Sequence, residues 1–154
     1  MKKICLLFFA VALCLSSYAQ YVDLGLPSGT KWKSSNETGG NNGYYTYGEA
    51  VKAFGNKLPT RQQIEELIDK CKWEWLKDKK AYKVTGPNGN FIILPALGSR
   101  DNGRDVVDMG KYGLYWSSYP DGSEGAWIIA FASDFFDTDW EERSSRLSVR
   151  LVQK

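Results

Sequence analysis

The spacing of apolar and polar residues divides the chain into one clear helix and a series of strands. Between positions 61 and 71, apolar side chains recur at the i, i+3, i+4, i+7 spacing of one helical face, with charged and amide side chains between them. Thr60 precedes this stripe, and Gln63 follows three residues later, which is the pattern of a capping box. The sequence therefore predicts an amphipathic helix that begins after Thr60.

Beyond this helix the pattern shifts toward the period of two that is typical of strands. Residues 81–85 and 90–94 bracket the turn sequence GPNG and predict a β-hairpin. Residues 91–94 are apolar on both faces, which predicts a strand at the centre of a sheet, and residues 126–132 are also apolar throughout. In residues 146–151, arginine and serine alternate with leucine and valine, which predicts a half-exposed final strand.

The remaining segments complete the expected fold class. Residues 21–24 and 30–34 predict two short strands around a turn rich in glycine and proline, and residues 114–118 predict a further strand. Residues 99–110 are polar and predict a surface loop, and residues 120–125 predict a turn. This order of elements predicts an α+β domain in which one or two helices pack on a largely antiparallel sheet.

The N-terminus predicts export. Lys2 and Lys3 precede a short apolar stretch that ends at small residues, so residues 1–19 are expected to be a signal peptide and residues 20–154 a single domain. A lipoprotein signal ending at Cys14 is a weaker alternative because bulky Leu13 precedes that cysteine. We therefore expect the protein in the periplasm, on the outer surface or secreted.

Charge and residue usage exclude several classes of function. Removal of the two leader lysines leaves 18 basic and 18 acidic residues, and this balance argues against a nucleic-acid or anionic-membrane partner. The chain has no histidine, which excludes Ser-His-Asp and Cys-His nucleophilic sites and histidine-ligated metals. Cys71 is the one cysteine beyond the leader, so no internal disulfide or thiolate cluster is expected there. Its place on the apolar stripe predicts a buried, unreactive thiol.

The acidic residues do not predict a metal site. Asp134, Asp137 and Asp139 are oxygen-bearing and closely spaced, but they lack the glycine and terminal glutamate of an EF-hand loop. We expect a solvated acidic loop there, and neither a metal nor another cofactor. Paired carboxylates such as Glu65 and Glu66 keep glycoside hydrolysis open as a minor alternative.

Four strings of residues carry a family resemblance. They are YVDLGLPSGTKW at 21–32, LPT at 58–60, YWSS at 115–118 and SVRLV at 148–152. In this order they resemble the Fibrobacter succinogenes major paralogous domain family of exported proteins from gut Bacteroidetes and their relatives. The resemblance covers about residues 21 to 152 and implies a fold like the C-type lectins and the formylglycine-generating enzymes, in which the two chain ends meet. It implies no known reaction, because none is assigned to the family.

The copper-dependent catalysis and the calcium-dependent binding found in proteins of that fold are not expected in this chain. The copper-binding pair of cysteines of formylglycine-generating enzymes is missing, since Cys71 stands alone. The Glu-Pro-Asn, Gln-Pro-Asp and Trp-Asn-Asp signatures of calcium-dependent lectins are also missing from the sequence. In lectin-like folds the loops between the later strands usually meet the ligand, which corresponds here to residues 99–110, 119–125 and 133–145.

Aromatic and polar residues near those loops are the candidate binding residues. Trp32, Trp116 and Trp127 lie in predicted strands and are expected in the core. By contrast, the candidates lie among polar or glycine residues and provide hydrogen bonds or stacking faces: Arg100, Asn102, Arg104, Tyr112, Tyr119, Asp121 and Trp140. The sequence thus predicts a non-enzymatic recognition or adhesion domain for a glycan or protein, with no transmembrane segment in the mature chain. A structural component of the cell surface is the second hypothesis, and a glycan-active enzyme is the third.

Overall fold

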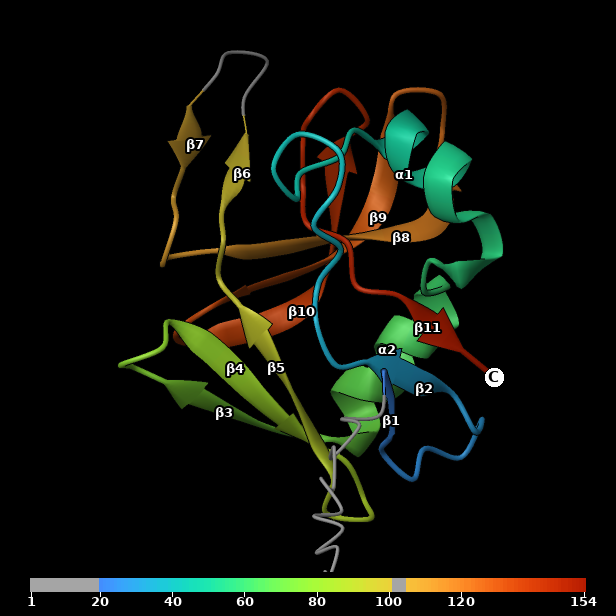
Figure 1. Ribbon diagram of the computed structural model, residues 1–154, viewed down its shortest axis with the longest axis vertical. Helices are drawn as coiled ribbons and strands as arrows, with labels where there is room; N and C mark the ends of the chain where they lie inside the picture. The colour runs from blue at the N-terminus through green and yellow to red at the C-terminus, as the bar shows by residue number, and fades with distance from the viewer. Residues whose placement is uncertain (1–19, 101–104) are drawn as a thin grey trace, which may run out of the picture.

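The protein has an α+β fold in which helices pack against mostly antiparallel sheets (Figure 1). The computed structural model describes residues 20–100 and 105–154, and the predicted leader at 1–19 lies outside this range. The predicted fold class is therefore confirmed at the level of α+β. Among the described residues, no helix has both the length and the apolar character needed to cross a bilayer.

Two α-helices and a short 3₁₀ helix form the helical part: α1 (Tyr47–Phe54), η1 (Gly55–Lys57) and α2 (Arg61–Lys70). The strands are β1 (Tyr21–Asp23), β2 (Lys31–Lys33), β3 (Lys72–Leu76), β4 (Ala81–Thr85), β5 (Phe91–Pro95), β6 (Ser99–Arg100), β7 (Val106–Val107), β8 (Gly113–Asp121), β9 (Gly125–Ala132), β10 (Phe135–Glu142) and β11 (Val152–Gln153).

Both α-helices begin with a capping box. In α2 the Gln63 amide N–H donates to Thr60 Oγ1, and the Gln63 side chain accepts from the Thr60 backbone N–H, which confirms the predicted helix start. Helix α1 has the same arrangement between Thr46 and Glu49. The pair Thr46 and Glu49 is therefore a second helix-start signal in the sequence. Helix α1 is the second helix where one or two were predicted.

A three-stranded sheet with the order β10-β9-β8 lies at the centre, and α2 contacts all three of its strands (Figure 1). The sheet β3-β4-β5 contains the predicted hairpin, in which Thr85 pairs with Phe91. A third sheet has the order β1-β2-β11, so the first and last described strands share a sheet. The expected meeting of these chain segments is confirmed.

The predicted central position of residues 91–94 is wrong. Strand β9 is central, but β5 is an edge strand, and its Phe91 is 49% exposed. One face of β5 packs in the core through Ile92 and Leu94, and its outer edge is approached by a side chain of the C-terminal segment rather than by another strand. There the Ile93 carbonyl accepts a hydrogen bond from buried Arg150.

Two predicted loops contain strands. The acidic stretch 133–145 was expected to be a solvated loop, but it contains the eight-residue edge strand β10. Phe136 and Thr138 are half-buried while Asp137 and Asp139 are exposed, so the stretch alternates as a strand does. The polar stretch 99–110 contains the short β6–β7 pair.

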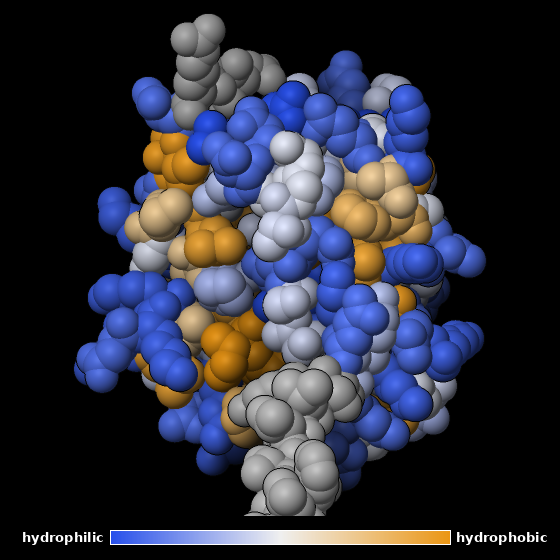
Figure 2. Space-filling view, viewed as in Figure 1, coloured by the Kyte–Doolittle hydropathy of each residue, from blue (hydrophilic) through white to orange (hydrophobic). Residues whose placement is uncertain are grey.

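The core has two parts, one on each face of β9. Ile129 and Phe131 pack in the part that includes Leu67 of α2, whereas Ile128 and Ala130 pack in the part that includes Leu58. The predicted core positions of Trp32 and Trp116 are confirmed, since both are 0% exposed. Apolar residues also reach the surface in separate patches between hydrophilic ones, as Figure 2 shows for one face.

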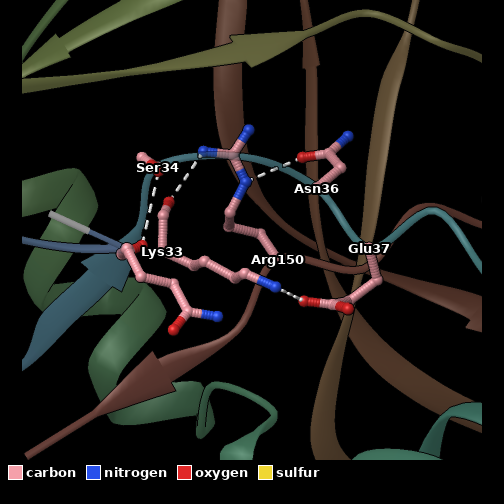
Figure 3. Close-up of polar contacts among 6 residues, drawn as sticks. Lys33, Ser34, Asn36, Glu37 and Arg150 are labelled. Atoms are coloured by element: carbon pink, nitrogen blue, oxygen red, sulfur yellow. Dashed lines mark hydrogen bonds and ion pairs between the residues drawn. The ribbon is translucent and has the colours of Figure 1, made fainter. Parts of the chain in front are cut away.

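Arg150 is buried, although the alternating pattern predicted a half-exposed side chain there. It is 2% exposed and donates hydrogen bonds to three neutral oxygens. Nε donates to Asn36 Oδ1 at 2.7 Å and Nη1 to the Lys33 carbonyl at 3.0 Å (Figure 3). Nη2 donates to the Ile93 carbonyl at 2.7 Å. The nearby Glu37 carboxylate forms an ion pair with Lys33, and its negative charge also favours the charged form of Arg150. Burial lowers the pKa of Arg150 from its ordinary value.

Tyr115 extends this buried network to the central sheet. Its hydroxyl donates to the Pro95 carbonyl at 2.6 Å and accepts from Asn36 Nδ2 at 3.1 Å. Burial raises the pKa of Tyr115 to about 12. Asn36 therefore links Arg150 to Tyr115, and the network joins β5, β8 and the segment after β2.

Replacement of Arg150 by methionine is expected to lower the free energy of unfolding by about 3 kcal/mol, because buried oxygens would lose charged donors. Arg146→Met is the matched control, since the Arg146–Glu49 ion pair is partly exposed and should contribute less than about 1 kcal/mol. Urea unfolding monitored by tryptophan fluorescence would measure both changes. Equal losses for the two variants would contradict the structural role of Arg150.

The raised pKa of Tyr115 predicts a loss of stability in alkali. Below pH 10 Tyr115 is neutral in both the folded and unfolded states, so its contribution to the free energy of unfolding is fully present. Above pH 10 the unfolded chain releases this proton while the folded protein retains it up to about pH 12. Unfolding should therefore become more favourable by up to about 3 kcal/mol across this window. Thermal melts should show a shallower pH dependence for Tyr115→Phe, and an unchanged slope would contradict this assignment.

Candidate functional site

A cleft of about 580 Å³ lies at the end of the central sheet where β9 turns into β10. Three connections border it: the β3–β4 turn, the segment between β7 and β8, and the β9–β10 turn. Its most chemically informative lining residues are Trp75, Lys77, Lys80, Lys111, Tyr112 and Asp134. We call this the lysine cleft. The hydrophilic projections on the left of Figure 2 lie where Figure 1 places the tip of the β3–β4 hairpin.

Backbone hydrogen bonds fix the walls of the lysine cleft. The Ala96 N–H donates to the Lys80 carbonyl at 2.9 Å, and the Gly110 N–H donates to the Ala96 carbonyl at 2.8 Å. The Lys111 N–H donates to the Asp108 carbonyl at 3.0 Å, which closes a tight turn. The lysines therefore project from a braced frame rather than from independent loops.

Two residues of this frame have a backbone conformation that non-glycine residues rarely adopt. Lys80 has a φ of 48° and Asp108 has a φ of 56°. The left-handed region costs about 1–2 kcal/mol for a residue with a Cβ. Residues held in this way cluster at functional sites, because the surrounding structure must maintain them. Lysine thus occupies position 80 although glycine would adopt this backbone conformation with less strain.

Aromatic rings form part of the wall. Trp75 is half-buried and contacts Tyr82 edge to face, with ring centroids 5.1 Å apart. Tyr112 is 40% exposed and lies 6.4 Å from the ring of Phe135. Trp75 is therefore held by the core, while Tyr112 leaves much of its ring open to a ligand.

The lysine cleft is locally basic in a chain that has no overall excess of charge beyond the leader. Its lining residues include three lysines and one carboxylate, Asp134. Lys111 also lies 3.7 Å from Asp108, but both side chains are well exposed and this ion pair is weak. The lining therefore favours an anionic ligand.

The predicted site residues do not form one site. Tyr112 lines the lysine cleft, whereas Tyr119, Asp121 and Trp140 lie near the opposite end of the central sheet. Arg100 lies elsewhere, with its guanidinium carbon 5.5 Å from the Tyr44 ring centroid. Asn102 and Arg104 lie outside the described residues. The three lysines were not predicted, although the sequence KDKK at 77–80 was a visible signal for a basic turn.

The exposed aromatic candidates fit the predicted division between core and surface. Tyr119 is 49% exposed and Trp140 is 43% exposed, as expected for surface residues. Trp127 was expected in the core but is only half-buried. Its ring is covered by the guanidinium of Arg61, whose central carbon lies 3.8 Å from the ring centroid.

Cys71 is poorly suited to act as a nucleophile. It follows α2, is half-buried and packs against the core. Burial, with a smaller effect from Glu66, raises the pKa of its thiol to about 11. Since the thiolate is the reactive form, this environment lowers its reactivity. Across the part of the chain that the structure describes, the His, Cys, Asp and Glu side chains form no cluster of three able to hold a metal.

Comparison with known proteins gives a family but no ligand. Residues 57–152 match the model of a family described as a domain of unknown function (DUF8237). The matched range includes α2, the central sheet and all lining residues of the lysine cleft. No curated protein and no solved structure matches the chain. The resemblance to the Fibrobacter succinogenes family stays a prediction.

Native Cys71 should react slowly with a disulfide reagent such as DTNB. A shift of its pKa from 9.0 to about 11 reduces the thiolate population about 100-fold at pH 8. The expected result is labelling at least about 100-fold slower for the native protein than for the same protein unfolded in urea. Native labelling as fast as unfolded labelling would show that Cys71 is a reactive thiol.

Proposed function

The chain belongs to the family of domains of unknown function DUF8237, and we propose that it is a non-enzymatic recognition domain that binds acidic saccharides in the lysine cleft. The observation that carries this proposal is the presence of three lysines and two aromatic rings around one braced concave site. Neither the charge nor the rings alone would favour a saccharide.

The side chains of the lysine cleft complement the chemical groups of an acidic sugar. Ammonium groups of Lys77, Lys80 and Lys111 attract a carboxylate or sulfate group and donate hydrogen bonds to it. The faces of Trp75 and Tyr112 offer apolar contact to the C–H surface of a pyranose ring. Asp134 accepts hydrogen bonds from sugar hydroxyls. A cleft of about 580 Å³ also falls within the usual range for small-molecule sites.

The lining of the cleft favours binding over hydrolysis. Glycoside hydrolysis usually requires two carboxyl groups placed across the scissile bond. Asp134 is the one carboxylate among the lining residues. A structural role at the cell surface stays the second hypothesis, and it predicts no saccharide binding by the isolated domain.

Export and a C-type-lectin-like arrangement are also part of this proposal. The lysines and apolar stretch within residues 1–19 support export. The sheet β1-β2-β11, which joins the first and last described strands, supports a lectin-like closure of the domain. An extracellular or periplasmic location would give the lysine cleft access to acidic polysaccharides.

The proposal is tested by calorimetric titration with tetragalacturonate, which carries carboxylates, and with a heparin-derived tetrasaccharide, which carries sulfates. At least one should bind, and its affinity should fall as salt increases. Lys80→Gly should weaken that binding about tenfold, because it removes one ammonium group from the site. It should preserve or raise stability, since glycine adopts a φ of 48° without strain.

Lys72→Gln is the matched control, because Lys72 is exposed on β3 but does not line the cleft. It should bind like the unmodified protein. Failure of both saccharides to bind would refute the proposal, as would equal affinities of the Lys80→Gly and Lys72→Gln variants. A concentration-dependent oligomer without saccharide binding would instead support the structural role.

A further inference from the structure

A second surface lies near the opposite end of the central sheet, where β8 turns into β9. It consists of Tyr119 on β8, Trp127 on β9, Trp140 on β10 and Arg61 at the start of α2. We call it the aromatic face. Trp127 and Trp140 are paired residues of neighbouring antiparallel strands, so their side chains project from the same side of the sheet.

The Trp140 indole lies against Gly125, where the absence of a side chain leaves room for it. A Cβ at position 125 would collide with three atoms of the indole: Nε1, Cε2 and Cζ2. The ring therefore occupies the space where a side chain at position 125 would stand. With 43% of Trp140 exposed, the opposite side of the indole is available to a ligand.

Trp127 and Arg61 form the middle of the aromatic face. The Arg61 guanidinium stacks on the Trp127 ring, with its central carbon 3.8 Å from the centroid. Its Nε donates to Glu65 Oε1 at 2.8 Å, which holds the guanidinium over the ring and pairs its charge. The middle of the surface thus carries oriented N–H donors and little net charge.

Tyr119 completes the row on the third strand. Pro120 pairs with Ala126, whose side chain is in the core part on the other side of β9. The register of β8 shifts between Trp116 and Pro120, and alternation over the single step from Pro120 to the residue before it places Tyr119 on the same side as Trp127. Its 49% exposure agrees with a surface position. The Ser118 N–H donates to the Pro59 carbonyl at 2.8 Å, which fixes this part of β8 beside the start of α2.

We propose that the aromatic face binds an uncharged, β-1,4-linked hexopyranose chain, at a site separate from the lysine cleft. Tyr119 and Trp140 start from strands that are two positions apart, which corresponds to about 10 Å between their backbones. In a flat β-1,4-linked chain every second sugar presents the same face, with a similar repeat. The two rings therefore stack on alternate sugars, and Arg61 donates hydrogen bonds to a hydroxyl between them.

The local charge favours this ligand over the acidic saccharide of the lysine cleft. The one cation in the row, Arg61, already has a carboxylate partner, whereas the lysine cleft has three lysines and one carboxylate. A protein partner would also use tryptophan, tyrosine and arginine. However, protein hot-spot residues usually project into a pocket of the partner, whereas the Trp140 indole is held against Gly125 of the sheet.

Gly125→Ala tests this inference without removing any aromatic ring, because the new methyl group should lift Trp140 from the sheet. The probe is cellohexaose, measured by calorimetry and by the change in tryptophan fluorescence. We expect the unmodified protein to bind cellohexaose and Gly125→Ala to bind it at least about tenfold more weakly. Gly48→Ala is the matched control, since a Cβ at Gly48 meets no atom within 4 Å.

Further variants keep the test decisive. If Gly125→Ala fails to fold, Trp140→Ala and Tyr119→Ala replace exposed side chains and should fold while losing cellohexaose binding. Lys80→Gly should bind cellohexaose like the unmodified protein, so failure at one site is distinguishable from failure at the other. The inference is overturned if the unmodified protein does not bind cellohexaose, if folded ring variants bind it normally, or if a protein partner buries Trp140 instead.

Discussion

The buried guanidinium of Arg150 is the interaction on which the arrangement of the sheets depends. It donates to the Lys33 carbonyl at the end of β2, to Asn36 in the next segment and to the Ile93 carbonyl in β5. All three acceptors are neutral, and the nearby Glu37 carboxylate also favours the charged form of this buried guanidinium. Such a group is tolerated only where every donor direction is well matched, and that requirement fixes the relative positions of the joined segments.

The central sheet depends on the same network through Tyr115. The Tyr115 hydroxyl bonds to Asn36 and to the Pro95 carbonyl, so β8 is tied to the end of β5 and to the segment that follows β2. With one edge of the central sheet fixed in this way, hydrogen bonds of the turns themselves complete the two ends, such as those from Gly110 to Ala96 at one end and from Arg143 to Gly122 at the other. Both proposed binding surfaces are built at these ends, where exposed side chains do not weaken the packing.

The sequence predicted those elements whose signals are local. The capping box at Thr60 and the apolar stripe after it located α2, and the GPNG turn located the β4–β5 hairpin. Strand β10 was missed because its charged residues resemble a loop, although they alternate with Phe136 and Trp140. The half-exposed position predicted for Arg150 was wrong because alternation shows only which residues share a side of a strand. Whether that side faces water depends on Ile93 and Asn36, which are distant in sequence.

The same limit applies to the candidate site. Exposure of Tyr112, Tyr119 and Trp140 followed from their polar neighbours, and the structure agrees with it. Their separation into two places did not follow, because it depends on the register of β8, β9 and β10. The lysine cleft was missed for a related reason, since its three lysines come from two connections that only the fold brings together.

Strand β9 connects the two surfaces physically. Trp127 and Phe131 lie on the same side of this strand, four residues apart, with buried Ile129 between them. The aromatic face lies at the Trp127 end, and the turn after Ala132 supplies Asp134 to the lysine cleft. The two sites therefore share strand β9, which pairs with β10 along its whole length, while their ligand-contacting side chains lie at opposite ends of the central sheet. Such an arrangement allows each surface to change its specificity by substitutions at the periphery, whereas a change within β9 would disturb both.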